Sequence, residues 1–325
     1  MDVSVIIPCW NYGRFLEEAV DSVLQQSVNN LEVLIIDDGS DDDTPSIIEA
    51  ITPKDPRIRS FRTAHLGPAH ARNLGTAEAR GRYIAFLDCD DRWLPQKLER
   101  QLGVMESEPD VVMHFTNLIW FTDDTHFRGN LFNYLVGLDR IPSRPSRDGS
   151  GTVITSDPFV SLLRLPMLAP VPSATMVRAE VVRSLEWRDG LHPAEDYEYF
   201  TRVSALGDVA YVNDILVQAR RHGNNSFNDR VTPPKSWIRA FNHMLDVDRH
   251  TLPEHHRREV QAKVGRVWSG LGWQYYWRRR PFAAASAYLS ALKYPEVRGK
   301  ALAHLITLPI VPFLPPKDQN DEELP

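Results

Sequence analysis

The chain has 325 residues, of which 42% are hydrophobic and 25% are charged. These fractions are typical of globular proteins and exclude wholesale disorder, collagen and low-complexity fibres. The two cysteines, Cys9 and Cys89, are too few to hold such a chain together by disulfides or to build a zinc site from thiolates alone. The length corresponds to about two domains. The small number of cysteines favours a reducing compartment, and we predict a cytoplasmic location.

Neither the start nor the interior of the sequence predicts a membrane span. The first ten residues contain a short apolar run without a basic n-region or a small-residue cleavage site, so we interpret it as a strand. The longest apolar stretch, residues 301–314, is interrupted by one histidine, one threonine and two prolines.

Charge is distributed unevenly along the chain, whose formal net charge is −6. Residues 1–60 carry twelve acidic and four basic side chains, whereas residues 230–300 carry fourteen basic and five acidic ones. This asymmetry predicts a cation site near the start and an anionic ligand or surface near the end.

Short apolar runs alternate with helical patterns in the first third of the chain. Strands are predicted at 3–8, 31–37, 58–61 and 83–87. Helices are predicted at 13–26, 68–79 and 92–108, and a further helix is predicted to begin with Thr44 as its cap. Because the strands are β-branched and nearly all apolar, they resemble parallel strands covered on both faces. The alternation predicts a doubly wound sheet with its ligand site at the carboxyl ends of the strands.

The remaining chain is less regular. We predict a strand at 111–115, an irregular excursion at 122–158, a strand at 173–177, a helix near 194–206, and a strand pair around 209–212 and 215–219. From about residue 233 the pattern is helical, and residues 315–325 have the composition of a frayed acidic tail.

Two acidic clusters follow predicted strands. The segment 37–40 reads as a turn and helix cap, but at a strand end its carboxylates could also accept hydrogen bonds from a nucleobase or ribose. Asp88, Asp90 and Asp91 repel one another unless a cation neutralises them, which favours Mg²⁺ or Mn²⁺ over a solvated turn.

Two further clusters lie in the second half. Glu195 and Asp196 are explained, from the residues alone, by the preference of acids for the first turn of a helix. The segment 220–226 is a basic, glycine-containing loop after a strand, which could hold a diphosphate, with His222 completing a metal site; a solvated loop is the alternative.

Four motifs together resemble family 2 glycosyltransferases of the GT-A fold: VSVIIPCWNYGRFLEEAVDSVLQQS, LEVLIIDDGSDDDT, GPAHARNLG and GRYIAFLDCDDRW. The resemblance covers about residues 1–225. It implies an α/β fold, with a Rossmann-like, mostly parallel sheet flanked by helices and a C-terminal α-helical extension. It also implies a nucleoside pocket lined by Pro8, Asp38 and Arg72, and a D-x-D motif of Asp88 and Asp90 that meets ribose, metal and diphosphate. Asp91 is an alternative metal ligand.

The same resemblance assigns the second half of the site. Inverting members of the family place an acidic pair beneath the acceptor, so Asp196 is expected as the base and Glu195 as its orienter or substitute. The segment 220–226 resembles the closing R-x-H segment of the family, so Arg221 and His222 are expected donor-binding residues, with His222 also an expected metal ligand. The implied domains are a nucleotide-sugar half (1–115), an acceptor half (116–230), a helical extension (231–314) and a tail (315–325).

The resemblance implies a metal-dependent inverting transfer of a sugar from a nucleotide donor, by family majority UDP-linked, to a sugar or glycoconjugate acceptor. Two rival functions stay open at this point. A sugar-phosphate nucleotidyltransferase requires a glycine-rich, basic phosphate loop after the first strand, but PCWNYGRFLEE has one glycine and no lysine. A binding module with a helical recruitment tail would not need Asp88, Asp90 and Asp196 together.

Nucleic-acid binding is disfavoured because the half that carries the motifs is acidic. The basic, aromatic segment 233–314 has two interpretations: a helical packing element, or a peripheral contact with an anionic membrane that brings the site to a lipid-linked acceptor. The sequence predicts neither the sugar nor the oligomeric state.

Overall fold

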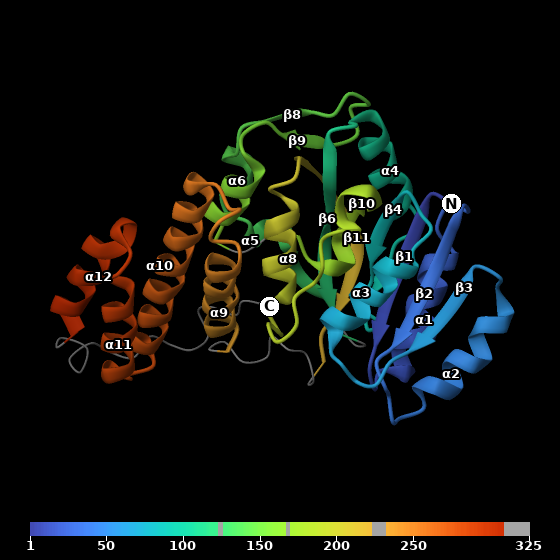
Figure 1. The fold of residues 1–325 in the computed structure, drawn as a ribbon, viewed down its shortest axis with the longest axis horizontal. Coiled ribbons are helices and arrows are strands. Elements are labelled where there is room, and N and C mark those ends of the chain that lie inside the picture. Colours follow the sequence, from blue (N-terminus) through green and yellow to red (C-terminus); the bar gives the residue numbers. More distant parts are fainter. Residues whose placement is uncertain (123–125, 167–169, 223–231, 309–325) are drawn as a thin grey trace. The chain divides into compact units, whose positions relative to one another are not determined.

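The computed structural model describes residues 1–122, 126–166, 170–222 and 232–308. The chain divides into two units, residues 1–223 and 224–325, and each is described by itself. The first unit contains a sheet surrounded by helices, and the second consists of helices (Figure 1). The predicted tail, 315–325, and residues 223–226 of the basic loop lie outside the described residues.

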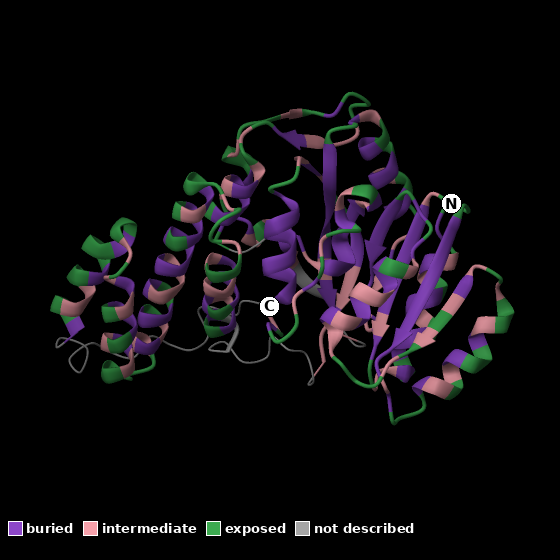
Figure 2. Ribbon diagram, viewed as in Figure 1, coloured by how far each residue is buried: buried purple, intermediate pink, exposed green. Residues whose placement is uncertain are grey.

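Four parallel strands form one half of the sheet, in the order β3-β2-β1-β4. They are β1 (Val3–Cys9), β2 (Leu31–Asp37), β3 (Ile58–Arg62) and β4 (Tyr83–Phe86). All seven residues of β2 and all four of β4 are buried, as the apolar runs predict for strands covered on both faces (Figure 2). The predicted βαβ alternation is confirmed in this half.

Three helices connect these strands: α1 (Gly13–Leu24), α2 (Thr44–Ile51) and α3 (Pro68–Glu78). The short 3-10 turn η1 (Thr52–Lys54) follows α2. Thr44 is not the cap of α2 but its first residue, preceded by Asp43. The reason is local, because the Asp42 carboxylate accepts a hydrogen bond from the Thr44 N–H at 2.9 Å and so supplies the capping acceptor.

The helix predicted at 92–108 begins later than expected. Arg92 and Trp93 form the short strand β5 (Arg92–Trp93), which pairs antiparallel with β11 (Asp208–Arg220), and the helix α4 (Lys97–Ser107) starts only after Pro95. The Leu94 N–H also donates to the Leu216 carbonyl at 2.9 Å. Residues 92–94 therefore bond to the sheet, and the helix begins only after Pro95. The helical spacing of apolar residues around Trp93 does not indicate this pairing.

The other half of the sheet contains β6 (Val111–Phe121), β10 (Thr175–Arg178) and β11. Since β10 lies antiparallel between β4 and β6, the sheet is mixed rather than mostly parallel. The strand pair predicted at 209–219 is wrong: β11 is one strand parallel to β6, with register shifts between Val212 and Ile215 and between Ile215 and Val217. The polar residues 213–214 form an irregularity in the ladder, not a hairpin turn.

The stretch expected to be irregular, 122–158, contains short elements within its described residues. They are β7 (His126–Asn130), α5 (Leu131–Tyr134), η2 (Leu138–Arg140), β8 (Ser143–Pro145) and β9 (Thr152–Ile154). Asn130 closes a capping box on α5, and the buried Glu108 carboxylate binds Arg144 at 2.7 Å. The first unit continues with α6 (Pro158–Arg164), η3 (Pro172–Ala174), α7 (Ala179–Val182) and α8 (Glu195–Val203).

The second unit has four helices in its described residues: α9 (Thr232–Val247), α10 (Glu254–Trp277), α11 (Pro281–Ala291) and α12 (Pro295–Thr307). Helix α10 packs against the other three. Small, aliphatic and aromatic residues fill the core between α10, α11 and α12, including Leu271, Ala284, Tyr288 and Ala301. Among the helices described, none combines the length and the apolar composition needed to cross a membrane.

Candidate active site

Several of the predicted site residues lie at the carboxyl ends of β1, β2 and β4. Because these neighbouring strands are parallel, the residues that follow them meet at one edge of the sheet. Pro8 lies at the end of β1 opposite Ile36, Asp38 follows β2, and Asp88 begins the acidic loop after β4 (Figure 1). The structure therefore brings together segments that the sequence separates.

Arg72 joins the acidic loop to the acidic pair of α8. Its guanidinium, carried by α3, donates from Nη1 to Glu195 Oε1 and from Nη2 to Asp88 Oδ1, both at 3.0 Å. Arg72 is only 5% exposed, and its Cζ lies 4.7 Å from the ring centroid of Trp187. A buried cation between two carboxylates fixes their separation, so donor-side and acceptor-side candidates share one rigid contact.

Glu195 and Asp196 are adjacent in sequence but differ in acidity. Burial, and next the charge of Glu195, raise the pKa of Asp196 to about 8. Burial alone would also raise the pKa of Glu195, yet a hydrogen bond from His192 and the charge of Arg72 lower it to about 2. The surroundings thus favour the ionised form of Glu195 and the protonated form of Asp196.

Asp90 contacts His222, the last described residue of the basic loop. Nε2 of His222 lies 3.0 Å from Asp90 Oδ2, and the imidazole packs 5.3 Å from the ring of Tyr12 and 5.4 Å from that of Phe15. Burial and then the charge of Asp88 raise the pKa of Asp90. The two expected metal ligands Asp90 and His222 are therefore neighbours.

Asp91 is engaged by the protein itself. Its Oδ1 accepts the Arg220 N–H at 2.9 Å, and its Oδ2 accepts the Ser173 hydroxyl at 2.6 Å. Burial, followed by the charge of Asp90, raises the pKa of Asp91 well above its usual range. These contacts favour Asp88 and Asp90 over Asp91 as the ligands of a cation.

The acidic loop fits a divalent cation held jointly with a diphosphate. Burial and mutual repulsion of the carboxylates disfavour ionisation, which a hard cation would reverse. Among the residues described, the loop does not place three ligand atoms within 4.8 Å of one another. That arrangement suits Mg²⁺ or Mn²⁺, which take one or two carboxylates and complete their shell with phosphate oxygens and water.

Asp38 organises the loop after β3. Its Oδ1 accepts hydrogen bonds from Thr63 Oγ1 at 2.5 Å and Leu66 N at 2.8 Å, and its Oδ2 accepts the Gly67 N–H at 2.7 Å. Gly39 beside it has φ of +75°, where a Cβ would lie 2.7 Å from His65 N, so the predicted turn needs glycine there. Asp38 thus shapes the expected nucleoside pocket through its neighbours.

Two groups near the site were not identified from the sequence. Trp10, 46% exposed, stacks on His65 with ring centroids 4.2 Å apart, beside Asp38. His192 Nδ1 lies 3.3 Å from Glu195 Oε2, and its bond to Glu195 raises the pKa of His192. Trp10 lies within the first sequence motif, where it could have been identified. The only sequence signal for His192 is its position three residues before Glu195.

Arg221 lies between the acidic loop and an aromatic ring. Its Cζ is 5.3 Å from the ring centroid of Trp120, and its backbone N–H donates to the Phe121 carbonyl at 2.7 Å. Burial lowers the pKa of its guanidinium, and the charge of Asp91 opposes that shift. The structure thus places Arg221 next to β6, while its role toward a donor stays a prediction.

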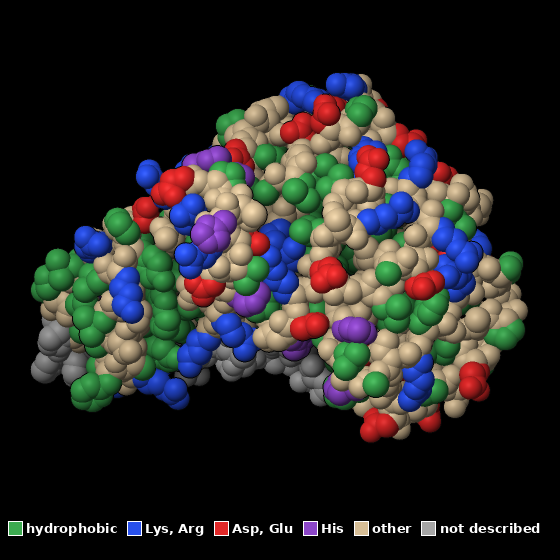
Figure 3. Space-filling view, viewed as in Figure 1, with side chains coloured by type: hydrophobic (Ala, Val, Ile, Leu, Met, Phe, Trp, Pro, Cys, Tyr) green, Lys and Arg blue, Asp and Glu red, His purple; other side chains and the backbone are tan. Residues whose placement is uncertain are grey.

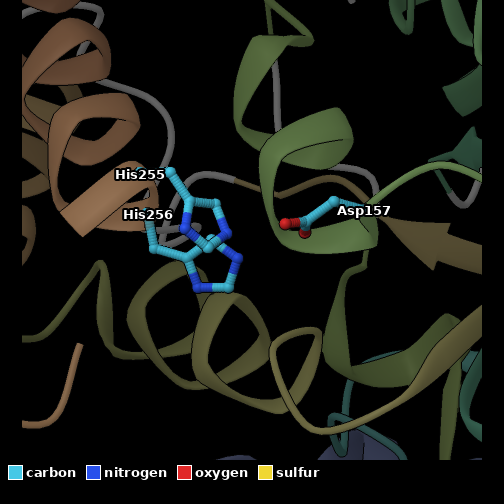
Figure 4. A group of neighbouring side chains, drawn as sticks. All are labelled: Asp157, His255 and His256. Atoms are coloured by element: carbon cyan, nitrogen blue, oxygen red, sulfur yellow. The ribbon is translucent and has the colours of Figure 1, made fainter. Parts of the chain in front are cut away.

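Histidines also gather at the start of α10. His255 and His256 occupy its first turn with ring centroids 4.3 Å apart, and Figure 4 shows them together with Asp157, the N-cap of α6. Asp157 belongs to the first unit and the two histidines to the second.

Comparisons with known proteins find similar sequences. The model of the family described as "Glycosyl transferase family 2" matches residues 4–157. The glycosyltransferase GlyG of Streptococcus pneumoniae is 26% identical over 73% of this chain and 76% of its own length. The putative teichuronic acid biosynthesis glycosyltransferase TuaG of Bacillus subtilis is 44% identical over 32% of this chain and 41% of its own length.

Solved structures share the fold. The chain resembles S. aureus TarS 1-349 in complex with UDP-GlcNAc, with a TM-score of 0.63 and 17% identity over 96% of this chain and 87% of that chain. It also resembles the mannosyltransferase PcManGT from Pyrobaculum calidifontis in complex with GDP-Man and Mn²⁺, with a TM-score of 0.61 and 17% identity over 97% and 81% of the two chains. These likenesses confirm the α/β fold.

The match to several curated relatives is confined to part of their length. An uncharacterized glycosyltransferase of Rickettsia felis is 51% identical over 112 residues, which are 34% of this chain but 18% of that protein. The family model covers residues 4–157, where the four motifs lie. Residues 4–157 of the chain are therefore similar to glycosyltransferase family 2.

Proposed function

We propose that the chain is an inverting glycosyltransferase that moves a sugar from a nucleoside diphosphate to a hydroxyl acceptor. The observation that carries this proposal is the Arg72 bridge, because it ties Asp88 of the acidic loop to Glu195, the neighbour of Asp196. A transferase needs leaving-group stabilisation and a base within one site, and this contact holds the two parts together. We further propose that residues 1–115 bind the donor and residues 116–230 face the acceptor.

In this mechanism Asp196 removes the proton from the attacking hydroxyl. Glu195 stays ionised through His192 and Arg72, keeps Asp196 basic, and orients the pair. Arg221 and His222 provide cationic or hydrogen-bonding groups for the departing diphosphate. A single displacement with the base on the face opposite the leaving group inverts the anomeric carbon, and a second nucleophilic carboxylate is not required.

Asp88 and Asp90, with His222, would hold the divalent cation, Mn²⁺ or Mg²⁺. When bound there, the cation supplies charge stabilisation to the diphosphate leaving group. The carboxylates would also be released from the repulsion that raises the pKa of Asp90, so cation and nucleotide binding should be coupled.

The nucleoside is proposed to bind at the ends of β1 and β2. Pro8, Asp38 and Arg72 come from the resemblance, and the exposed Trp10–His65 stack adds a flat aromatic surface suited to a base. UDP is our proposal for the nucleotide, supported by the TarS complex, whereas the PcManGT complex contains GDP-Man. The test is a donor screen: UDP-, GDP- and dTDP-sugars are incubated with Mn²⁺ or Mg²⁺, and release of the nucleoside diphosphate is measured.

The raised pKa of Asp196 predicts the pH dependence of transfer. Because the base must be deprotonated, kcat/KM should rise with pH through the neutral range instead of near pH 4. Glu195→Gln removes the charge that helps to raise the pKa of Asp196, so its acidic limb should move to lower pH. A profile measured from pH 5 to 9 that is flat in the wild-type chain would contradict the assignment of Asp196.

We also propose a peripheral contact between the second unit and an anionic membrane surface, which would place a cytoplasmic enzyme beside a lipid-linked acceptor of polysaccharide or glycoconjugate synthesis. On the outward face of α11, Phe282 is 91% and Leu289 57% exposed; on α12, Leu302 is 50% and Ile306 70% exposed. Figure 3 shows apolar side chains over these helices. Residues 278–308 carry six basic side chains and one acidic one, a balance that suits anionic headgroups.

Vesicle sedimentation tests this contact with the full chain. Binding should rise with the anionic lipid fraction and weaken with salt, since each surface cation contributes about 1 kcal/mol. The double variant Phe282→Ser/Ile306→Ser should stay in the supernatant, whereas Leu206→Ser, which replaces a half-exposed leucine of the first unit, should sediment normally. A wild-type chain that remains in the supernatant at low salt would contradict the membrane contact.

A further inference from the structure

The acidic loop is anchored by a residue that lies far from it in sequence. Ser173 is 2% exposed and belongs to η3, directly before β10. Because β10 is inserted next to β4, residue 173 reaches the point where β4 ends. At that point the Leu87 N–H donates a hydrogen bond to the Ile6 carbonyl of β1 at 3.0 Å. The next backbone N–H, that of Asp88, donates to the Ser173 hydroxyl at 3.1 Å.

The same hydroxyl also contacts the other end of the loop. It donates to Asp91 Oδ2 at 2.6 Å while it accepts from Asp88 N. Within the loop, the Asp91 N–H donates to the Asp88 carbonyl at 3.0 Å. One oxygen therefore connects both ends of the turn that contains Asp90, and both of its bonds depend on the hydroxyl.

Ser173 is itself fixed from the side of β5 and α4. The indole Nε1 of Trp93 donates to the Ser173 carbonyl at 2.7 Å, and Lys97 Nζ lies 3.6 Å from the ring centroid of Trp93. Gln101 Nε2 donates to the carbonyl of the following residue, Ala174, at 3.1 Å. The serine is thus held on its backbone side and presents its hydroxyl to the loop.

We propose that Ser173 is a positioning residue for the cation and diphosphate site, acting by holding Asp88 and Asp91 so that the turn carrying Asp90 keeps one conformation. The inference rests on the proposed function, in which Asp88 and Asp90 bind the cation. Groups that orient metal ligands typically change metal affinity 10- to 100-fold when they are removed. Trp93 supports Ser173 and is expected to act in the same direction with a smaller effect.

The experiment measures Mn²⁺ binding, from the electron paramagnetic resonance signal of free Mn²⁺, for the full chain in the presence of UDP. Ser173→Ala should raise the Mn²⁺ dissociation constant about tenfold or more. Ser204→Ala is the matched control, because it removes another buried hydroxyl, one that donates to Thr201 O within the first unit. Thermal unfolding without metal should show comparable losses for the two variants, and the Mn²⁺ affinity of Ser204→Ala should stay at the wild-type value.

Trp93→Phe provides a second variant if Ser173→Ala does not fold, since it removes the indole donor and keeps an aromatic ring. If a variant that folds binds Mn²⁺ with wild-type affinity, the role of Ser173 is overturned. The proposed function is left intact by that result. If the wild-type chain with UDP binds no Mn²⁺, the proposed function is overturned together with this inference.

Discussion

Asp90→Ala should abolish sugar transfer. The substitution removes the carboxylate that contacts His222 and that we assign to the cation, so the leaving diphosphate loses stabilisation of several kcal/mol. This corresponds to a loss of about 10³-fold or more in rate. The measurement is turnover of the nucleotide sugar identified in the donor screen, with and without EDTA.

The matched control for this substitution is Asp214→Ala. Asp214 is an exposed acid on β11 that pairs with Arg100 at 2.6 Å, so its loss changes the charge of the first unit by the same amount away from the loop. We expect its activity to be close to wild type. Full activity of Asp90→Ala, or of the wild-type chain in EDTA, would refute metal-dependent catalysis.

Asp196→Asn should separate catalysis from binding. The amide keeps the size of the carboxyl group but cannot accept a proton at neutral pH, so transfer should fall about 10²-fold or more. Affinity for UDP should stay near the wild-type value, because Asp196 is assigned to the acceptor and not to the nucleotide. Single-turnover transfer and calorimetric UDP binding, measured on the same preparation, give the two quantities.

Glu195→Gln distinguishes the two members of the pair. Because Glu195 binds Arg72 and holds a low pKa, we expect reduced but measurable transfer with a shifted pH profile. An inactive Glu195→Gln together with a fully active Asp196→Asn would require the two roles to be exchanged.

The donor-side half of the fold could be predicted from local patterns. The strands that become β1, β2 and β4 are continuous apolar runs, and the turn at Gly39 is encoded by residues that favour it. Acidic residues at strand ends were placed in the site because parallel topology brings such ends together. These signals lie within a few residues of the features that they predict.

Long-range pairings could not be predicted in the same way. The strand formed by Arg92 and Trp93 depends on β11, and the insertion of β10 between β4 and β6 depends on neither sequence periodicity nor turn residues. The Arg72 bridge and the contacts of Ser173 follow from that topology. The sequence motifs indicated most of the candidate site residues, and the fold supplied their partners.

Calorimetric titration of the full chain with UDP, in the presence and absence of Mn²⁺, tests the central claim most directly. The account predicts saturable heat with UDP and Mn²⁺ together, a strong loss when Mn²⁺ is replaced by EDTA, and a comparable loss in Asp90→Ala. If none of UDP, GDP and dTDP produces binding heat with Mn²⁺ present, the carboxyl-terminal edge of the sheet that carries Asp88 and Asp90 is not a nucleotide-sugar site. That result would contradict the proposed function.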